Sequence, residues 1–145
     1  MMSELTLTFV DDSEADHVLI QDAVEALAFP VRCHHFVHAR PFMEALDRGE
    51  IAPHAVITDL NMPGPTGFDL IGALRTRPMW AHLPVLILST SPADVDRERA
   101  ATLNIAGYFV KPVLYAALVE QLHEMVTLVQ RWTPAAPAGR NLLDP

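Results

Sequence analysis

The chain has 145 residues, of which half are apolar and 19% are charged, and its formal net charge is −8. This length fits one domain with a buried core rather than two domains. The acidic balance argues against a nucleic-acid partner, which clustered lysine and arginine would bind, and no run reaches the ~18 apolar residues that a membrane helix needs.

The first two predicted elements are a strand and a helix. Residues 5–10 alternate apolar side chains with threonine, which is typical of a strand, and the acidic pair at 11–12 follows directly. Residues 13–28 carry apolar side chains at helical spacing. Ser13 and Asp16 have the spacing of a capping box, so we expect the helix to begin there.

A second strand, a short helix and a third strand come next. Residues 31–37 resemble a strand, and Pro41 suits the first turn of a helix that ends at Gly49. Residues 55–58 form the kind of mostly apolar run that is found in a buried parallel strand. This run ends at Asp59.

The third helix and the fourth strand also have clear signals. Thr66 and Asp69 repeat the capping-box spacing and open a helix that extends through Leu74. Residues 84–88 are the most apolar of the predicted strands, and Ser89 follows them.

The C-terminal part predicts two further helices and a strand. Pro92 suits the first position of a helix over residues 92–103, which is so polar that we expect it to be the element most able to shift. Residues 108–110 form the last strand, which ends at Lys111. A long helix over residues 113–132 has one core stripe. The stripe consists of Leu114, Leu118, Leu122, Met125 and Val129.

Strand and helix alternate five times, which predicts an α/β fold with helices on both faces of a parallel sheet. Because crossovers between parallel strands are right-handed, few topologies remain. We expect a flavodoxin-like three-layer sandwich whose five strands lie in the order 2-1-3-4-5.

The cysteine and histidine residues indicate the compartment of the protein and argue against a histidine metal site. Cys33 is the single cysteine, so no internal disulfide forms, and residues 1–4 lack the features of a signal peptide. We therefore expect a reduced, cytoplasmic setting and a small apolar role for Cys33. His34, His35 and His38 lie close together without further ligands, and we expect surface or loop histidines.

The charged residues at the strand ends predict a shared site. The carboxyl ends of parallel strands meet at one edge of the sheet, where ligands bind. Asp11, Asp12 and Asp59 could supply oxygen ligands to Mg²⁺, whose charge would relieve their repulsion. Asp59 could then act as a nucleophile toward a phosphoryl group that Lys111 and Ser89 contact.

The same residues resemble the response-regulator receiver domain of two-component signalling, a CheY-like domain, and the resemblance covers about residues 4–131. We expect this domain over residues 4–132, a Pro-rich tail over residues 133–145 and no output domain. The matching residues are Asp11, Asp12, Asp59, Met62, Pro63, Gly67, Ser89, Tyr108, Lys111 and Pro112.

The resemblance implies roles that the residues alone do not. The acidic pair binds Mg²⁺, for which Mn²⁺ could substitute, and the backbone carbonyl of Asn61 is a further ligand. Ser89 is the switch hydroxyl, with the adjacent Thr90 as the competing candidate, and Tyr108 changes its side-chain position with it. The peptide bond before Pro112 is expected to be cis.

A narrower likeness is to stand-alone receivers that are paired with phytochrome-type or other hybrid sensor kinases. Some of these form homodimers through the fourth helix, the fifth strand and the fifth helix. Apolar side chains off the core stripe would suit such a face, although Tyr115 and Val119 could instead complete the core. The candidate interaction face consists of Tyr108, Tyr115, Val119, Val126 and Trp132.

The predicted function is a single-domain response regulator. It would accept a phosphoryl group on Asp59 from a sensor histidine kinase and change its binding to a downstream protein. Its chemistry would be limited to self-phosphorylation and autodephosphorylation, so it would not be an enzyme in the ordinary sense. The alternative is an interaction module that keeps the fold and binds partners without phosphorylation.

Overall fold

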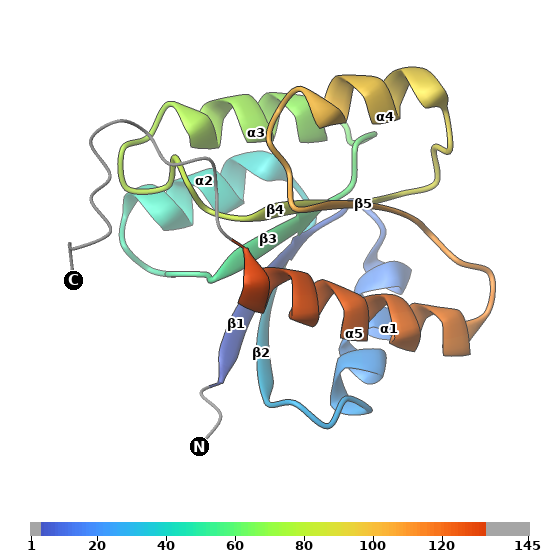
Figure 1. The fold of residues 1–145 in the computed structure, drawn as a ribbon. Coiled ribbons are helices and arrows are strands. Elements are labelled where there is room, and N and C mark those ends of the chain that lie inside the picture. Colours follow the sequence, from blue (N-terminus) through green and yellow to red (C-terminus); the bar gives the residue numbers. More distant parts are fainter. Residues whose placement is uncertain (1–3, 133–145) are drawn as a thin grey trace.

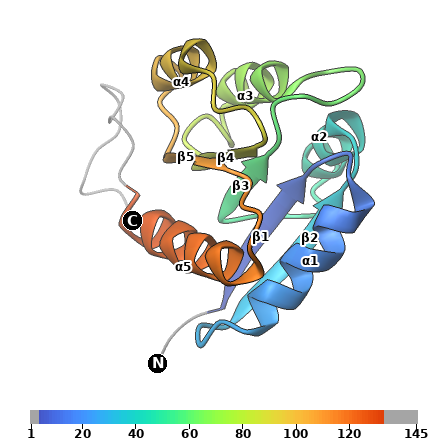
Figure 2. The same cartoon turned by 90° about the vertical axis from the view of Figure 1, so that its right-hand side faces the viewer.

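The computed structural model describes residues 4–132 and has a five-stranded parallel sheet in the order β2-β1-β3-β4-β5, which confirms the predicted fold class. Helices α1 and α5 cover one face of the sheet, and α2, α3 and α4 cover the other (Figures 1 and 2). The elements are β1 (Leu5–Val10), α1 (Glu14–Glu25), β2 (Val31–Phe36), α2 (Ala39–Asp47), β3 (Ala55–Thr58), α3 (Gly67–Arg75), β4 (Val85–Ser89), α4 (Asp94–Ala101), β5 (Gly107–Val110) and α5 (Tyr115–Arg131).

Two apolar layers hold the helices to the sheet. Successive strand residues point to opposite faces, so Ile57 packs with α1 and α5 while Val56 packs with the opposite helices. Leu86 and Ile87 divide in the same way. The central strands are therefore buried on both sides, which explains their nearly continuous apolar sequences.

The strand register brings the predicted site residues to one edge of the sheet. Val10 pairs with Thr58, and Ser89 pairs with Val110. The residues that follow these strands therefore emerge together at the carboxyl edge. They include Asp11, Asp59 and Lys111.

The helix starts agree only partly with the predictions. At α3 the capping box of Thr66 and Asp69 is complete. At α1 only half of the predicted box forms, because Ser13 accepts from the backbone N–H of Asp16 while the Asp16 carboxylate contacts Lys111 instead.

Helix α4 begins two residues after the predicted Pro92, at Asp94, and Ala93 caps it without a side-chain hydrogen bond. The hydroxyl of Ser91 donates instead to Asp96, within the first turn. Ala100 is the one residue of α4 that is buried, which agrees with the predicted weak apolar anchoring.

Helix α5 begins at Tyr115 rather than at residue 113, and this moves one end of its core stripe. Leu114 is 70% exposed and does not belong to the stripe, whereas Val126 is buried and does. The prediction that Val126 belongs to the interaction face is therefore wrong.

The peptide bond before Pro112 is trans, so the expectation of a cis bond is wrong. The two isomers before proline differ by only about 0.5–1 kcal/mol, so the local context decides between them.

The predicted surface or loop positions of the three neighbouring histidines hold only for His38, which is exposed, because His34 and His35 lie in β2 and are partly buried. His35 lies in β2, is half-buried, and stacks on Phe9 with 5.6 Å between the ring centroids. Cys33 packs against the core, and burial raises the pKa of its thiol to about 12, in agreement with the predicted apolar role.

The backbone at Gly67 packs closely against the backbone at Asp59, the predicted phosphoryl acceptor. A Cβ atom there would lie 2.2 Å from the carbonyl oxygen of Asp59 and 2.9 Å from the Cα atom of Leu60. We expect Gly67→Ala to lower the free energy of unfolding by about 2–3 kcal/mol, as forced overpacking does. Urea unfolding monitored by circular dichroism measures this change.

Gly72, in the same helix, is the matched control, since a Cβ atom there meets nothing within 4 Å. We expect Gly72→Ala to raise the free energy of unfolding by roughly 0.5–1 kcal/mol, from helix propensity. Equal stability of the two variants would contradict the close approach at Gly67.

Candidate functional site

Three carboxylates gather at the carboxyl edge of the sheet. Asp11, Asp12 and Asp59 each offer an oxygen, and the three oxygens lie within 4.8 Å of one another. Asp11 and Asp59 are buried, at 4% and 6% exposure, and Asp12 is exposed. A cluster of carboxylate oxygens that opens to solvent on one side fits a hard divalent cation, which takes oxygen ligands and keeps several waters.

The Lys111 ammonium partly neutralises these acids. Its Nζ atom lies 2.7 Å from Asp11 Oδ2, 2.7 Å from Asp16 Oδ2 and 3.1 Å from Asp59 Oδ2. Burial lowers the pKa of Lys111, but the hydrogen bonds to Asp11 and Asp16 and the nearby negative charges outweigh it and raise the pKa. Lys111, which is the only lysine in the sequence, is therefore a fixed positive charge at the site.

The Asp59 carboxylate is oriented from two sides. Its Oδ1 accepts from the backbone N–H of Leu60 at 2.7 Å and from that of Asn61 at 3.4 Å. Its Oδ2 accepts from Lys111. The backbone after β3 and the lysine after β5 thus fix a buried carboxylate in one position.

Asp11 is held by contacts that sequence reasoning did not identify. Burial raises the pKa of its carboxyl above the ordinary value, although Lys111 and the N–H of Ser13 oppose this shift. His17, which is buried, donates from Nε2 to the Asp11 carbonyl at 2.7 Å, and its Nδ1 lies 2.8 Å from Nδ1 of His35. His17 therefore fixes the backbone that presents Asp11.

Asp16 and His17 are the site residues that the sequence analysis missed. The capping-box spacing assigned Asp16 to the start of α1, and no pattern singled out His17. Their position in the first turn after the acidic pair is the one signal that could have found them, because that turn lies at the sheet edge.

The two candidate switch hydroxyls differ in environment. Ser89 is fully buried at the end of β4, whereas Thr90 is exposed. The Ser89 hydroxyl accepts from the N–H of Ser91 at 3.3 Å. The Tyr108 hydroxyl donates to the Ser91 carbonyl, and the Arg97 guanidinium lies 4.7 Å from the centre of the Tyr108 ring.

The remaining members of the candidate interaction face are partly occupied. Tyr115 is 42% exposed, but its hydroxyl donates to Asp22, so it turns toward α1. Val119 packs against the core. Trp132 is half-buried and donates from Nε1 to the His82 carbonyl at 3.3 Å.

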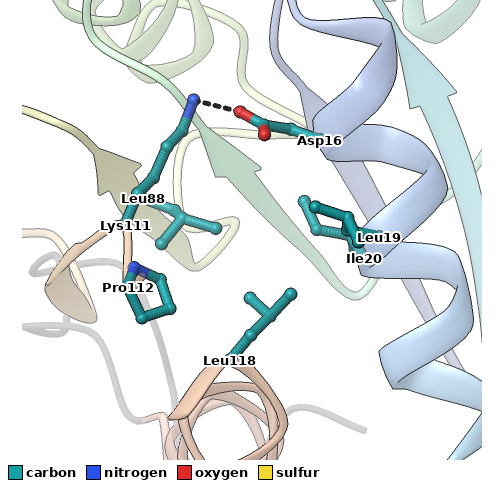
Figure 3. A pocket seen from close by; sticks show the side chains of 7 residues that line it. All are labelled: Asp16, Leu19, Ile20, Leu88, Lys111, Pro112 and Leu118. Carbon is teal, nitrogen blue, oxygen red and sulfur yellow. Dashed lines mark hydrogen bonds and ion pairs between the residues drawn. The ribbon is translucent and has the colours of Figure 1, made fainter. Parts of the chain in front are cut away.

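A small cavity of about 50 Å³ lies beside the site, between α1, the end of β4 and the start of α5 (Figure 3). The Asp16 carboxylate and the Lys111 ammonium meet at one end of it. Its other lining residues are apolar: Leu19, Ile20, Leu88, Pro112 and Leu118.

Among residues 4–132, no helix combines the length and apolar character needed to cross a membrane.

The sequence matches the response regulator receiver domain family over residues 7–123. It is 37% identical to the chemotaxis protein CheY of Pseudomonas aeruginosa over 70 residues, which are 48% of this chain and 56% of CheY. The match thus spans just over half the length of that relative.

Solved structures with the same fold include two response regulators. The phosphorylated cyanobacterial phytochrome response regulator RcpA matches with a TM-score of 0.81 at 21% identity, over 92% of this chain and 100% of RcpA. The Mn²⁺-bound response regulator Rcp1 matches with a TM-score of 0.78 at 20% identity, over 91% of this chain and 99% of Rcp1. At these identities the likeness shows the fold alone.

A divalent cation should stabilise the protein through the three clustered carboxylates. With Mn²⁺ at roughly ten times its dissociation constant, we expect the free energy of unfolding to rise by about 1.4 kcal/mol.

Asp12→Asn should weaken Mn²⁺ binding by about tenfold, because one of three anionic ligands is lost. Electron paramagnetic resonance measures the binding. Glu14→Gln removes an exposed charge from the same region and should leave binding nearly unchanged. Equal weakening in both variants would contradict the proposed ligand set.

Proposed function

The chain belongs to the response regulator receiver domain family, and we propose that it accepts a phosphoryl group on Asp59 from a sensor histidine kinase in a Mg²⁺-dependent reaction. One observation carries the proposal. The buried Asp59 carboxylate lies 3.1 Å from the ammonium of Lys111 and within 4.8 Å of two further carboxylates. Nucleophile, counter-charge and cation ligands therefore meet at one edge of the sheet.

The chemistry follows from these positions. An oxygen of Asp59 attacks the phosphorus of the donor, the bond between phosphorus and the donor nitrogen or oxygen breaks, and an acyl phosphate forms. Lys111 and the backbone N–H groups after β3, which donate to the Asp59 carboxylate, would donate to the new oxygens. Asp11, Asp12, Asp59 and the Asn61 carbonyl would hold Mg²⁺, which would neutralise charge on the phosphoryl group. Water later hydrolyses the acyl phosphate.

The output of the reaction would be a change around α4. The new phosphoryl group adds about −1.5 to −2 charges and several acceptors next to the end of β4. Ser89, buried there, turns its hydroxyl toward these acceptors and releases the N–H of Ser91. Tyr108 is tied to the carbonyl of the same Ser91, so its side chain follows.

The partners that fit this proposal are proteins. A phytochrome-type or hybrid sensor kinase would be the phosphoryl donor; RcpA, whose fold is similar, is described as a phytochrome response regulator. A downstream protein, or a second copy bound through α4, β5 and α5, would read the change at Tyr108. Constitutive binding without phosphorylation is the competing function, and the complete set of Asp59, Lys111 and acidic ligands favours the phosphorylated one.

Phosphorylation by a small donor tests the proposed function. Incubation with acetyl phosphate and Mg²⁺ should add one phosphoryl group to the wild-type protein, and Asp59→Asn should show no modification by intact-mass spectrometry. Asp94→Asn, an exposed acid outside the site, is the control and should react like the wild type. Modification of the Asp59→Asn protein would refute the assignment of Asp59 as the acceptor. A wild-type protein that does not react would refute the proposed function.

The switch can be followed through the tyrosines, of which the sequence has two. In fluorotyrosine-labelled protein, beryllofluoride with Mg²⁺ should shift the fluorine resonance of Tyr108, which Tyr115→Phe assigns by elimination. We expect Ser89→Ala to abolish this shift and Thr90→Ala to preserve it, because only Ser89 is buried at the site. A full shift in Ser89→Ala would refute the coupling through Ser89.

A further inference from the structure

We propose that Asp16 is a positioning residue for phosphoryl transfer, which anchors the Lys111 ammonium at the site. The inference rests on the proposed function. Asp16 lies outside the three-carboxylate cluster, yet its Oδ2 is 2.7 Å from Nζ of Lys111, the same distance as Asp11. Figure 3 shows the Asp16 side chain extending from α1 toward the lysine at one end of the apolar cavity.

The backbone of Asp16 is itself fixed. Its N–H donates to the Ser13 hydroxyl, and the Ser13 N–H donates to Asp11 Oδ1 at 2.9 Å. The neighbouring His17 donates to the Asp11 carbonyl. The first turn of α1 is therefore tied to the end of β1, and it presents the Asp16 carboxylate from a rigid support rather than from a mobile loop.

The charges explain why a separate anchor is needed. When the clustered carboxylates hold a divalent cation, Asp11 and Asp59 are engaged with it, and the cation repels the nearby ammonium. Of the three carboxylates that contact Lys111, only Asp16 then remains as a full counter-charge. Lysine carries a point charge on a flexible chain, so without that partner its ammonium would leave the site.

The ion pair with Asp16 still lets Lys111 bind a phosphoryl group. An ammonium has three donors, and Asp16 occupies one of them, so two remain for phosphoryl oxygens. The side chains of Lys111 and Asp16 are 15% and 32% exposed, and apolar residues lie on one side of the pair. The pair is therefore less screened than one on the open surface.

A purely structural role for Asp16 would be the usual favourable effect of an acid in the first turn of a helix. Glu14 lies in the same turn and has the same charge, but it is exposed. Glu14→Gln therefore serves as the matched control for helix charge. Asp16→Glu keeps the charge with a side chain one methylene longer and serves as the conservative rescue.

The first measurement is independent of phosphorylation. Because the sequence has one lysine, protein with isotopically labelled lysine gives a single side-chain ammonium signal by NMR. With saturating Mg²⁺ we expect this signal to persist in the wild type, in Glu14→Gln and in Asp16→Glu. It should be lost to exchange with water in Asp16→Asn, and each variant's thermal unfolding checks that it is folded.

The second measurement is the rate of modification by acetyl phosphate. We expect Asp16→Asn to react about fivefold more slowly, as the loss of one partly exposed charge-assisted contact implies, and Asp16→Glu to regain most of the rate. Glu14→Gln should match the wild type.

Either of two results would overturn the role of Asp16: a persistent ammonium signal and normal rate in Asp16→Asn, or an equal loss in Glu14→Gln. An unreactive wild-type protein would instead refute the proposed function, and the NMR comparison would still decide whether Asp16 anchors Lys111.

Discussion

The Lys111 ammonium contacts carboxylates from three separate segments: the end of β1, the first turn of α1 and the end of β3. Ion pairs as buried as those with Asp11 and Asp59 contribute little net stability, because desolvation offsets their attraction. A fold under selection for stability alone could replace them with apolar side chains. Their presence at the carboxyl edge of a parallel sheet instead agrees with the proposed site for phosphoryl transfer.

The parallel sheet explains why the charged residues at the strand ends meet. Asp11, Asp59 and Lys111 each follow a strand, and the parallel register brings those strand ends to one edge, whereas Asp16 reaches it from the first turn of α1. This is why the sequence could place the three acids at one edge of the sheet, where their carboxylates do lie together. Apolar runs locate buried strands, and a charged residue directly after such a run has few other places to lie. The element order and the strand order followed from the same alternation.

Other features depend on contacts that no local pattern contains. Asp16 is 95 positions from Lys111, and its spacing from Ser13 pointed to a capping role that the structure shows only in part. The late start of α5 left Leu114 exposed and placed Val126 in the core. Helical periodicity gives the angle between residues on a helix, whereas the position of its first residue depends on packing against the sheet.

Helix α4 is held differently from the other helices. Its few apolar contacts are supplemented by Arg97 over the ring of Tyr108 and Arg99 over the ring of Phe68, at 4.7 and 4.1 Å. Such contacts contribute roughly 0.5–1 kcal/mol each at exposed sites, so the helix can move at modest cost. A rigid charged site next to a weakly anchored helix is an arrangement suited to relaying a change of charge.

Chemical identification of the phosphorylated residue tests whether Asp59 is the acceptor. Borohydride reduces an acyl phosphate on aspartate to homoserine, and peptide mass spectrometry then locates the homoserine. After phosphorylation of the wild-type protein, we expect homoserine at position 59 and at no other aspartate. Homoserine elsewhere, or its absence from a protein that carries the phosphoryl group, would contradict the assignment of Asp59.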